Sequence, residues 1–133
     1  MLNEEEISRV LQNAGIEFAP NSSLYGVVVP SATTYMLAGP IANFAMSGFV
    51  IHFGRESLDI LPLDGYNNIQ PQGIHRLPLT GVSMLGIKKG MLMHTLIIVF
   101  QGNRLTFKVN KSVPGKPWHK NSLDRLMPYL EMK

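Results

Sequence analysis

Residues 92–110 read LMHTLIIVFQGNRLTFKVN, two runs of strand-forming residues on either side of Gly102-Asn103. Glycine and asparagine adopt the positive φ angles of a two-residue hairpin loop, so we expect an antiparallel hairpin here. In its second strand, apolar residues at 105, 107 and 109 alternate with polar or basic residues at 104, 106, 108 and 110. This alternation is typical of an antiparallel sheet with one buried face and one face in water.

The same pattern of short apolar runs and turns occupies most of the chain before this hairpin. We expect strands at residues 24–29, 33–38, 49–53, 57–63 and 74–87, the last bent near Gly81, followed by a turn at Lys88-Lys89-Gly90. Many short strands divided by glycine, proline and asparagine predict a β-sandwich or barrel.

Helices are expected at both ends of the chain. Asn3 can cap the first helix, the glutamates after it suit the positive end of the helix dipole, and Gly15 can end it. Pro117 suits the first position of a C-terminal helix. We expect that helix to end or kink near Met127, because Pro128 removes a backbone hydrogen bond.

The composition predicts one domain over residues 1–133, with residues 1–15 as an N-terminal helix. A chain of 133 residues has room for one core, and no repeat or long linker divides it. Hydrophobic residues make up 45% of the chain and charged residues 16%, so the chain is not of the disordered class. The absence of cysteine excludes disulfides, thiolate metal sites and a cysteine nucleophile.

Charge is distributed unevenly along the chain. Residues 1–70 hold seven acids and two bases, a net charge of −5, while residues 71–133 hold ten bases and two acids, a net charge of +8. Three of the seven acids belong to the start of the first helix, which accounts for them locally. The basic half has no comparable local explanation.

The basic half supplies the candidate binding residues. We predict that anions or lipid head groups bind at Lys88, Lys89, Arg104, Lys108 and Lys111. If these side chains share one surface, they would attract phosphate-bearing partners or an anionic membrane. Alternatively, they solvate separate edges and prevent aggregation. Nucleic acid is not expected, because the chain has no arginine-rich helix and no strand with aromatic residues spaced to stack bases.

No catalytic residue, metal ligand or cofactor is predicted. The histidines, His52, His75, His94 and His119, lie more than four residues apart, and no nucleophile elbow or phosphate loop occurs. We expect His52 and His94 in the core or on the sheet surface, His119 in water, and Asp59 on a wet sheet face. A small-ligand pocket would require two of the first three histidines to converge with Asp59.

Two further expectations concern methionine and the membrane. The clustered methionines at 84, 91 and 93 are expected to fill the core. Residues 35–53 are long enough to span a bilayer, but Gly39-Pro40 favours two buried strands joined by a loop. The N-terminus, with Glu4, Glu5 and Glu6, is unlike a secretory signal, so we expect a cytoplasmic protein.

The order of these elements resembles the bacterial pleckstrin-homology-like (PH-like) domains over residues 33–130. The resemblance rests on strand 49–53 followed by residues 58–63, on residues 74–79, on Gly81-Val82-Ser83 leading to the turn at 88–90, on the strand pair 96–100 and 105–109, and on Trp118, Leu123 and Leu126. It implies a mainly β fold: a bent, partly open antiparallel barrel of about seven strands with a C-terminal capping helix. The first helix and strand 24–29 would be an N-terminal addition. A lipocalin-like or other small barrel is the alternative.

The resemblance also implies a function. PH-like domains of this class resemble oligomerising modules, so we expect a non-catalytic module that binds a protein partner or self-associates. The alternatives are binding of anionic lipid or another polyanion through the basic half, and a small-ligand pocket.

Overall fold

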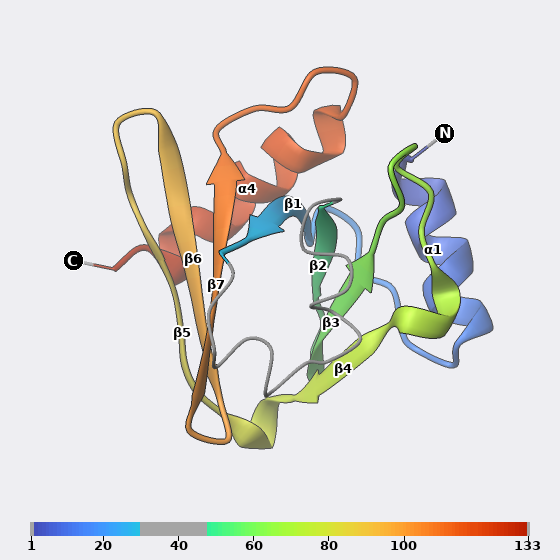
Figure 1. Ribbon diagram of the computed structural model, residues 1–133, viewed down its shortest axis with the longest axis horizontal. Coiled ribbons are helices and arrows are strands. Elements are labelled where there is room, and N and C mark those ends of the chain that lie inside the picture. The colour runs from blue at the N-terminus through green and yellow to red at the C-terminus, as the bar shows by residue number, and fades with distance from the viewer. Residues whose placement is uncertain (1, 30–47, 133) are drawn as a thin grey trace.

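The computed structural model describes residues 2–29 and 48–132. Seven strands form one antiparallel sheet in the order β4-β3-β2-β1-β7-β6-β5 (Figure 1). The elements are α1 (Glu4–Asn13), β1 (Ser23–Val28), β2 (Phe49–Phe53), β3 (Ser57–Pro62), η1 (Pro71–Gly73), β4 (His75–Pro78), η2 (Leu79–Gly81), β5 (Val82–Lys88), β6 (Met93–Phe100), β7 (Asn103–Asn110) and α4 (Pro117–Leu130). The expected mainly β fold, with a helix at each end, is confirmed. The sheet and its C-terminal helix are compatible with a PH-like fold.

Strand β1 joins the two halves of the sheet. Residues 23–26 pair with β2, and residues 27 and 28 pair with β7. The change of partner occurs beside Gly26, where a Cβ atom would lie 3.3 Å from both Ile51 Cδ1 and the Lys108 carbonyl oxygen. The sequence analysis placed this strand outside the PH-like part, but it is the middle strand of the sheet. The strand expected at residues 33–38 lies outside the described residues.

The main core lies between one face of the sheet and α4. Phe49, Leu96 and Phe107 are buried in it, and α4 contributes Leu123 and Leu126. The helix packs against β1 and β5, and in Figure 1 it lies behind the strands. Alternate residues of β6 and β7 therefore face the main core, as the alternation in the sequence predicts.

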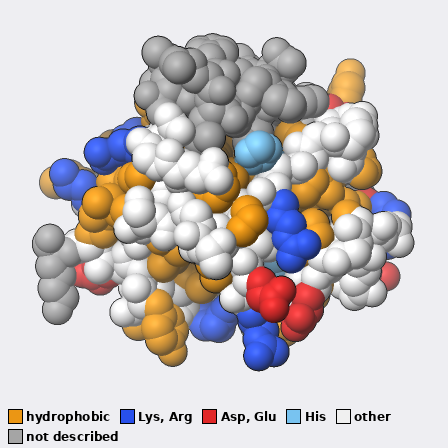
Figure 2. Space-filling model, turned by 90° about the horizontal axis from the view of Figure 1, so that it is seen from below, with side chains coloured by type: hydrophobic (Ala, Val, Ile, Leu, Met, Phe, Trp, Pro, Cys, Tyr) orange, Lys and Arg blue, Asp and Glu red, His pale blue; other side chains and the backbone are white. Residues whose placement is uncertain are grey.

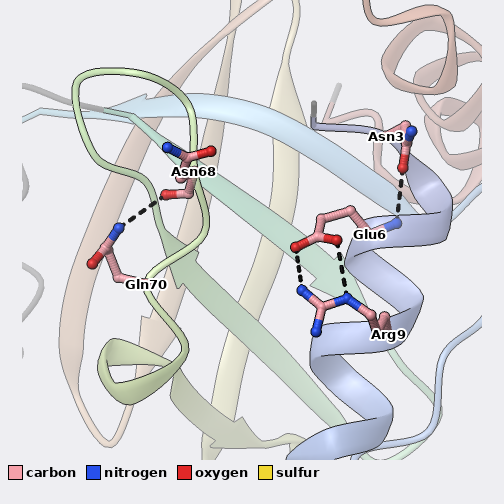
Figure 3. A network of polar contacts seen from close by, with 5 residues as sticks. All are labelled: Asn3, Glu6, Arg9, Asn68 and Gln70. Carbon is pink, nitrogen blue, oxygen red and sulfur yellow. Dashed lines mark hydrogen bonds and ion pairs between the residues drawn. The ribbon is translucent and has the colours of Figure 1, made fainter.

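A second core covers the opposite face of β2 and β3. Helix α1 buries Ile7 and Leu11 there, against Val50 and Leu61. The predicted helix cap is present, since the side-chain oxygen of Asn3 accepts a hydrogen bond from the backbone nitrogen three residues later, at 2.8 Å (Figure 3). Strands β2 and β3 are thus buried on both faces.

Three expectations about element bounds need correction. The hairpin turn consists of Gln101 and Gly102, with φ angles of 49° and 80°, so Asn103 is already the first residue of β7. Residues 74–87 form two strands separated by η2 rather than one bent strand. Helix α4 continues past Pro128 to Leu130, because the proline lies in the last turn, where it interrupts little of the helix, and Leu130 is buried in the core.

Candidate functional site

Three of the five predicted cations share one face of the sheet. Thr95 of β6 pairs with Lys88 of β5 on one side and with Lys108 of β7 on the other. Residues directly opposite in an antiparallel sheet point to the same face, and Arg104 lies an even number of residues before Lys108 on β7. Lys88, Arg104 and Lys108 therefore all point away from the main core, on what we call the outer face of β5–β7.

The outer face also exposes aliphatic side chains. The exposed fractions are 44% for Met84, 39% for Met93 and 39% for Val27, which pairs with Lys108. Strands β5, β6 and β7 contain no aspartate or glutamate. The outer face is thus basic and partly apolar, whereas the corresponding face of β2 and β3 lies beneath α1.

The other two predicted cations lie elsewhere. Lys89 and Lys111 line a cavity of about 540 Å³ beside α4, together with Lys120, Asp124 and Glu131. Glu131 pairs with Lys89 at 3.4 Å, and Asp124 pairs with Lys120 at 3.0 Å. The predicted set therefore divides into two groups, which meet where Lys88 and Lys89 adjoin in the chain.

The turn between β5 and β6 joins these two groups. All residues from 88 to 93 are exposed, with exposed fractions of 89% for Met91 and 85% for Leu92. The Nζ atom of Lys111 donates a hydrogen bond to the Met91 carbonyl oxygen at 2.6 Å. In Figure 1 the turn projects at the upper left, far from α1.

The sequence analysis missed this exposed pair. Met84, Met91 and Met93 were expected to fill the core, and all three are exposed. A usable signal was present, because Met91 and Leu92 directly follow the predicted Lys88-Lys89-Gly90 turn. Apolar residues next to a turn that is already predicted can belong to the turn rather than to the following strand.

Charge is dispersed on the face of the molecule that is seen from below (Figure 2). Figure 2, a view from below the orientation of Figure 1, shows blue Lys and Arg side chains scattered among hydrophobic and neutral ones, with acidic groups beside some of them. The basic half of the chain therefore does not form one continuous positive field on this face. The positions of the outer-face cations and of the cavity lysines therefore say more about binding than the net charge of the chain does.

The two most buried histidines hold backbone segments together. His52 Nδ1 lies 2.8 Å from the Ser23 hydroxyl, and its Nε2 accepts a hydrogen bond from the Ala19 nitrogen at 3.2 Å. Burial lowers the pKa of His52 to about 4. His119, expected in water, is instead buried, because its Nδ1 accepts from the Tyr25 nitrogen and its Nε2 donates to the Asn110 carbonyl. Both rings are neutral structural links between segments.

Asp59 is also buried rather than wet. The strand alternation was right, but the side of β3 on which Asp59 lies is covered, with Ile16 and Glu17 of the segment after α1 beside it. The Ser57 hydroxyl donates to its carboxylate at 3.1 Å, and Arg76 Nε lies 3.8 Å away. Burial, the largest influence, raises the pKa of Asp59, while the Ser57 hydrogen bond and Arg76 oppose that rise.

The convergence required for the small-ligand pocket is not found among the described residues. His52 lies opposite Asp59 in the pairing of β2 and β3, but His75 lies opposite Ile60 on the other face, and His94 belongs to the other half of the sheet. Within residues 2–29 and 48–132, no group of three or more histidines and carboxylates is placed to hold a metal ion.

Two further findings complete the description. No helix in the described part of the chain is long and apolar enough to cross a membrane. Comparisons with protein-family models, with curated proteins and with solved structures found no match. Function is therefore inferred from the geometry of the outer face and of the β5–β6 turn.

Proposed function

We propose that this chain is a non-catalytic interaction module of PH-like fold that binds an acidic protein partner through the outer face of β5–β7. The strand order, with β1 shared between the two halves, and the position of α4 on the inner face support the PH-like fold. The observation that carries the functional proposal is the unequal covering of the sheet. Strands β2 and β3 are buried on both faces. The outer face of β5–β7 buries Ile97 but leaves Met84, Met93 and its three cations exposed among the described residues.

The composition of the outer face fits a protein contact. Exposed Met84, Met93 and Val27 supply apolar area, and Lys108 is already ordered by a hydrogen bond from its Nζ to the Thr95 hydroxyl at 3.2 Å. Protein interfaces combine an apolar centre with polar and charged groups around it. A patch of exposed methionine can adapt its shape to a partner with little strain.

Charge favours an acidic partner over a second copy of the chain. Two copies stacked symmetrically on this face would bring Lys88, Arg104 and Lys108 of one copy against the same residues of the other. Like charges placed together at an interface suppress association, whereas an opposite charge steers it. Self-association through this face is therefore disfavoured, and an oligomer would have to use another surface.

The test uses charge reversal with a matched control. In the Arg104→Glu/Lys108→Glu variant, the outer face loses two cations and gains two acids. The Arg55→Glu/Lys120→Glu variant makes the same change in net charge at exposed positions on other surfaces. We expect the wild type and the control variant to capture the same acidic protein. The outer-face variant should bind that protein with an affinity lower by about tenfold or more.

Sedimentation velocity complements this capture experiment. We expect the wild type to be monomeric alone and to form a complex with a captured acidic protein. Identical capture by wild type and outer-face variant would contradict the proposal. A dimer abolished by the Arg104→Glu/Lys108→Glu variant would replace it with self-association. A second candidate, binding of anionic lipid, is favoured by a different observation, the exposed β5–β6 turn.

A further inference from the structure

Met91 and Leu92 form an aliphatic pair at the end of a projecting turn. Tyr66 and Tyr129 are similarly exposed, at 89% and 80%, but each carries a hydroxyl group that water can solvate. Met91 and Leu92 have exposed fractions of 89% and 85%, and their side chains carry no hydroxyl group. Large apolar side chains held in solvent are a feature of surfaces that become buried on binding.

Lysines surround this aliphatic pair. Lys88 and Lys89 precede the turn, and Lys111 reaches it from beyond β7 through its hydrogen bond to the Met91 carbonyl. Lys89 pairs with Glu131, while no ion pair within the described residues engages Lys88 or Lys111. Aliphatic groups at the centre and flexible ammonium groups around them match the boundary between acyl chains and anionic head groups.

The cavity beside α4 extends this arrangement. Lys89 and Lys111 both flank the turn and line the cavity of about 540 Å³, whose wall also includes Ser112 and Lys120. The cavity is also lined by Glu131 and Asp124, which pair with Lys89 and Lys120, so Lys111 is the lysine of the cavity without an ion pair among the described residues. A bilayer that touches the turn would bring its head groups to the mouth of this cavity. The apolar part of the wall, from Leu123 and Met127, is continuous with the core of α4.

We propose that the β5–β6 turn docks this protein onto anionic bilayers. Met91 and Leu92 enter the acyl boundary, and Lys88, Lys89 and Lys111 contact head-group phosphates. This surface shares Lys88 with the protein-binding outer face, but Met91, Leu92, Lys89 and Lys111 lie outside that face. Variants at these four residues therefore test membrane docking without changing Arg104 or Lys108. The aliphatic pair selects a membrane over a soluble anion, which would use the cavity alone.

The first test is co-sedimentation with vesicles that contain phosphatidylglycerol and phosphatidylcholine, compared with phosphatidylcholine alone. We expect binding to the anionic vesicles only, weakening as salt rises. The Met91→Ser/Leu92→Ser variant should bind about tenfold more weakly, because two side chains no longer leave water. The Tyr66→Ser/Tyr129→Ser variant, a matched loss of exposed apolar area elsewhere, should bind as the wild type does.

Lysine substitutions test the electrostatic part of the proposal. The Lys89→Gln/Lys111→Gln variant should lose about fivefold in affinity for each lysine and show a flatter dependence on salt. Equal salt dependence in this variant and in the wild type would overturn the role assigned to these lysines. Circular dichroism checks that each variant keeps the fold.

A fluorescent reporter tests insertion directly. Because the chain has no cysteine, Leu92→Cys supplies a single labelling site for an environment-sensitive dye, and Tyr66→Cys supplies the control site. We expect a blue shift on anionic vesicles for the label at 92 and no shift for the label at 66.

Three results would each overturn membrane docking. The first is absence of wild-type binding to the anionic vesicles at low salt. The second is unchanged binding of the Met91→Ser/Leu92→Ser variant. The third is displacement of the protein by soluble glycerol phosphate with no shift of the label at 92, which would assign the lysines to a soluble anion in the cavity.

Discussion

His52 is held as a neutral ring in the folded protein. Its Nε2 accepts from the Ala19 nitrogen, its ring stacks on Phe18 with centroids 5.3 Å apart, and burial lowers its pKa from 6.5 to about 4. In the unfolded chain the ring binds a proton near pH 6.5. The stability from His52 is therefore complete above pH 6.5 and is lost as the pH falls towards 4, amounting to about 3 kcal/mol. Burial also lowers the pKa of His119, which acts in the same direction.

A substitution at His52 separates this effect from general acid denaturation. We expect His52→Asn to lower the free energy of unfolding above pH 7 by about 1–3 kcal/mol, because a buried hydrogen bond and the ring contact are lost. Between pH 6.5 and 4, however, its stability should fall less steeply than that of the wild type. Urea unfolding at a series of pH values measures both quantities.

The matched control for this prediction is His75→Asn. Burial lowers the pKa of His75 as well, but its ring is only half-buried. This variant should therefore keep most of the pH dependence of the wild type. If the wild type and His52→Asn showed the same slope, the assignment of the acid sensitivity to His52 would be wrong.

At the scale of single elements, local sequence patterns predicted the strands, but they did not predict which distant strands pair. The hairpin of β6 and β7 was predictable because its turn and its alternation lie within one stretch of sequence. The turn itself moved by one residue, since Gln101 rather than Asn103 takes a positive φ angle. Strand β1 was recognised as a strand, but its central position depends on pairing with β2 and β7, which no local pattern reveals.

The burial of Asp59 shows what strand alternation leaves undetermined. Alternation along a strand shows which residues share a face, but it does not show what covers that face. Asp59 was correctly placed on the opposite face from Leu58 and Ile60, yet it is fully buried, with Ile16 and Glu17 beside it. The candidate lysines were likewise identified by type, while their division between the outer face and the cavity required the register of β5, β6 and β7.

Strand β1 offers a test of how the two halves are joined. At Gly26 a Cβ atom would lie 3.3 Å from Ile51 Cδ1 and the Lys108 carbonyl oxygen, and 3.4 Å from Phe107 Cβ. We expect Gly26→Ala to destabilise the protein by about 1–3 kcal/mol, because neighbours from both halves must move apart. Thermal and urea unfolding measure this change.

Gly65→Ala is the control, because nothing lies within 4 Å of the Cβ atom it would add. Its stability should stay within about 0.5 kcal/mol of the wild type. Equal stability of Gly26→Ala and Gly65→Ala would show that the close approach at β1 is easily relaxed. The junction would then be less tightly packed than the distances indicate.

At the scale of the whole molecule, the two halves of the sheet differ in what covers them. Helix α1 buries the outer face of β2 and β3, so that half has two cores and little free surface. The half formed by β5, β6 and β7 buries Ile97 on its outer face but leaves the cations of that face and the β5–β6 turn exposed. The contrast in charge along the sequence follows this division only in part. Lys88, Arg104 and Lys108 lie on β5 and β7, whereas other basic residues of the second half lie on β4, in turns and on α4. The two proposed binding surfaces thus lie on β5–β7, apart from the doubly covered strands β2 and β3.

This separation predicts that the two proposed binding activities can be lost independently. At physiological salt, charges further apart than about 8 Å are largely screened from one another. The Arg104→Glu/Lys108→Glu variant should therefore lose its acidic protein partner and retain most of its binding to anionic vesicles. The Met91→Ser/Leu92→Ser variant should show the reverse. Vesicle co-sedimentation and partner titration on the same protein samples measure both activities. Loss of both binding activities in either variant would contradict this prediction. The outer face and the turn would then form a single binding surface, joined at Lys88.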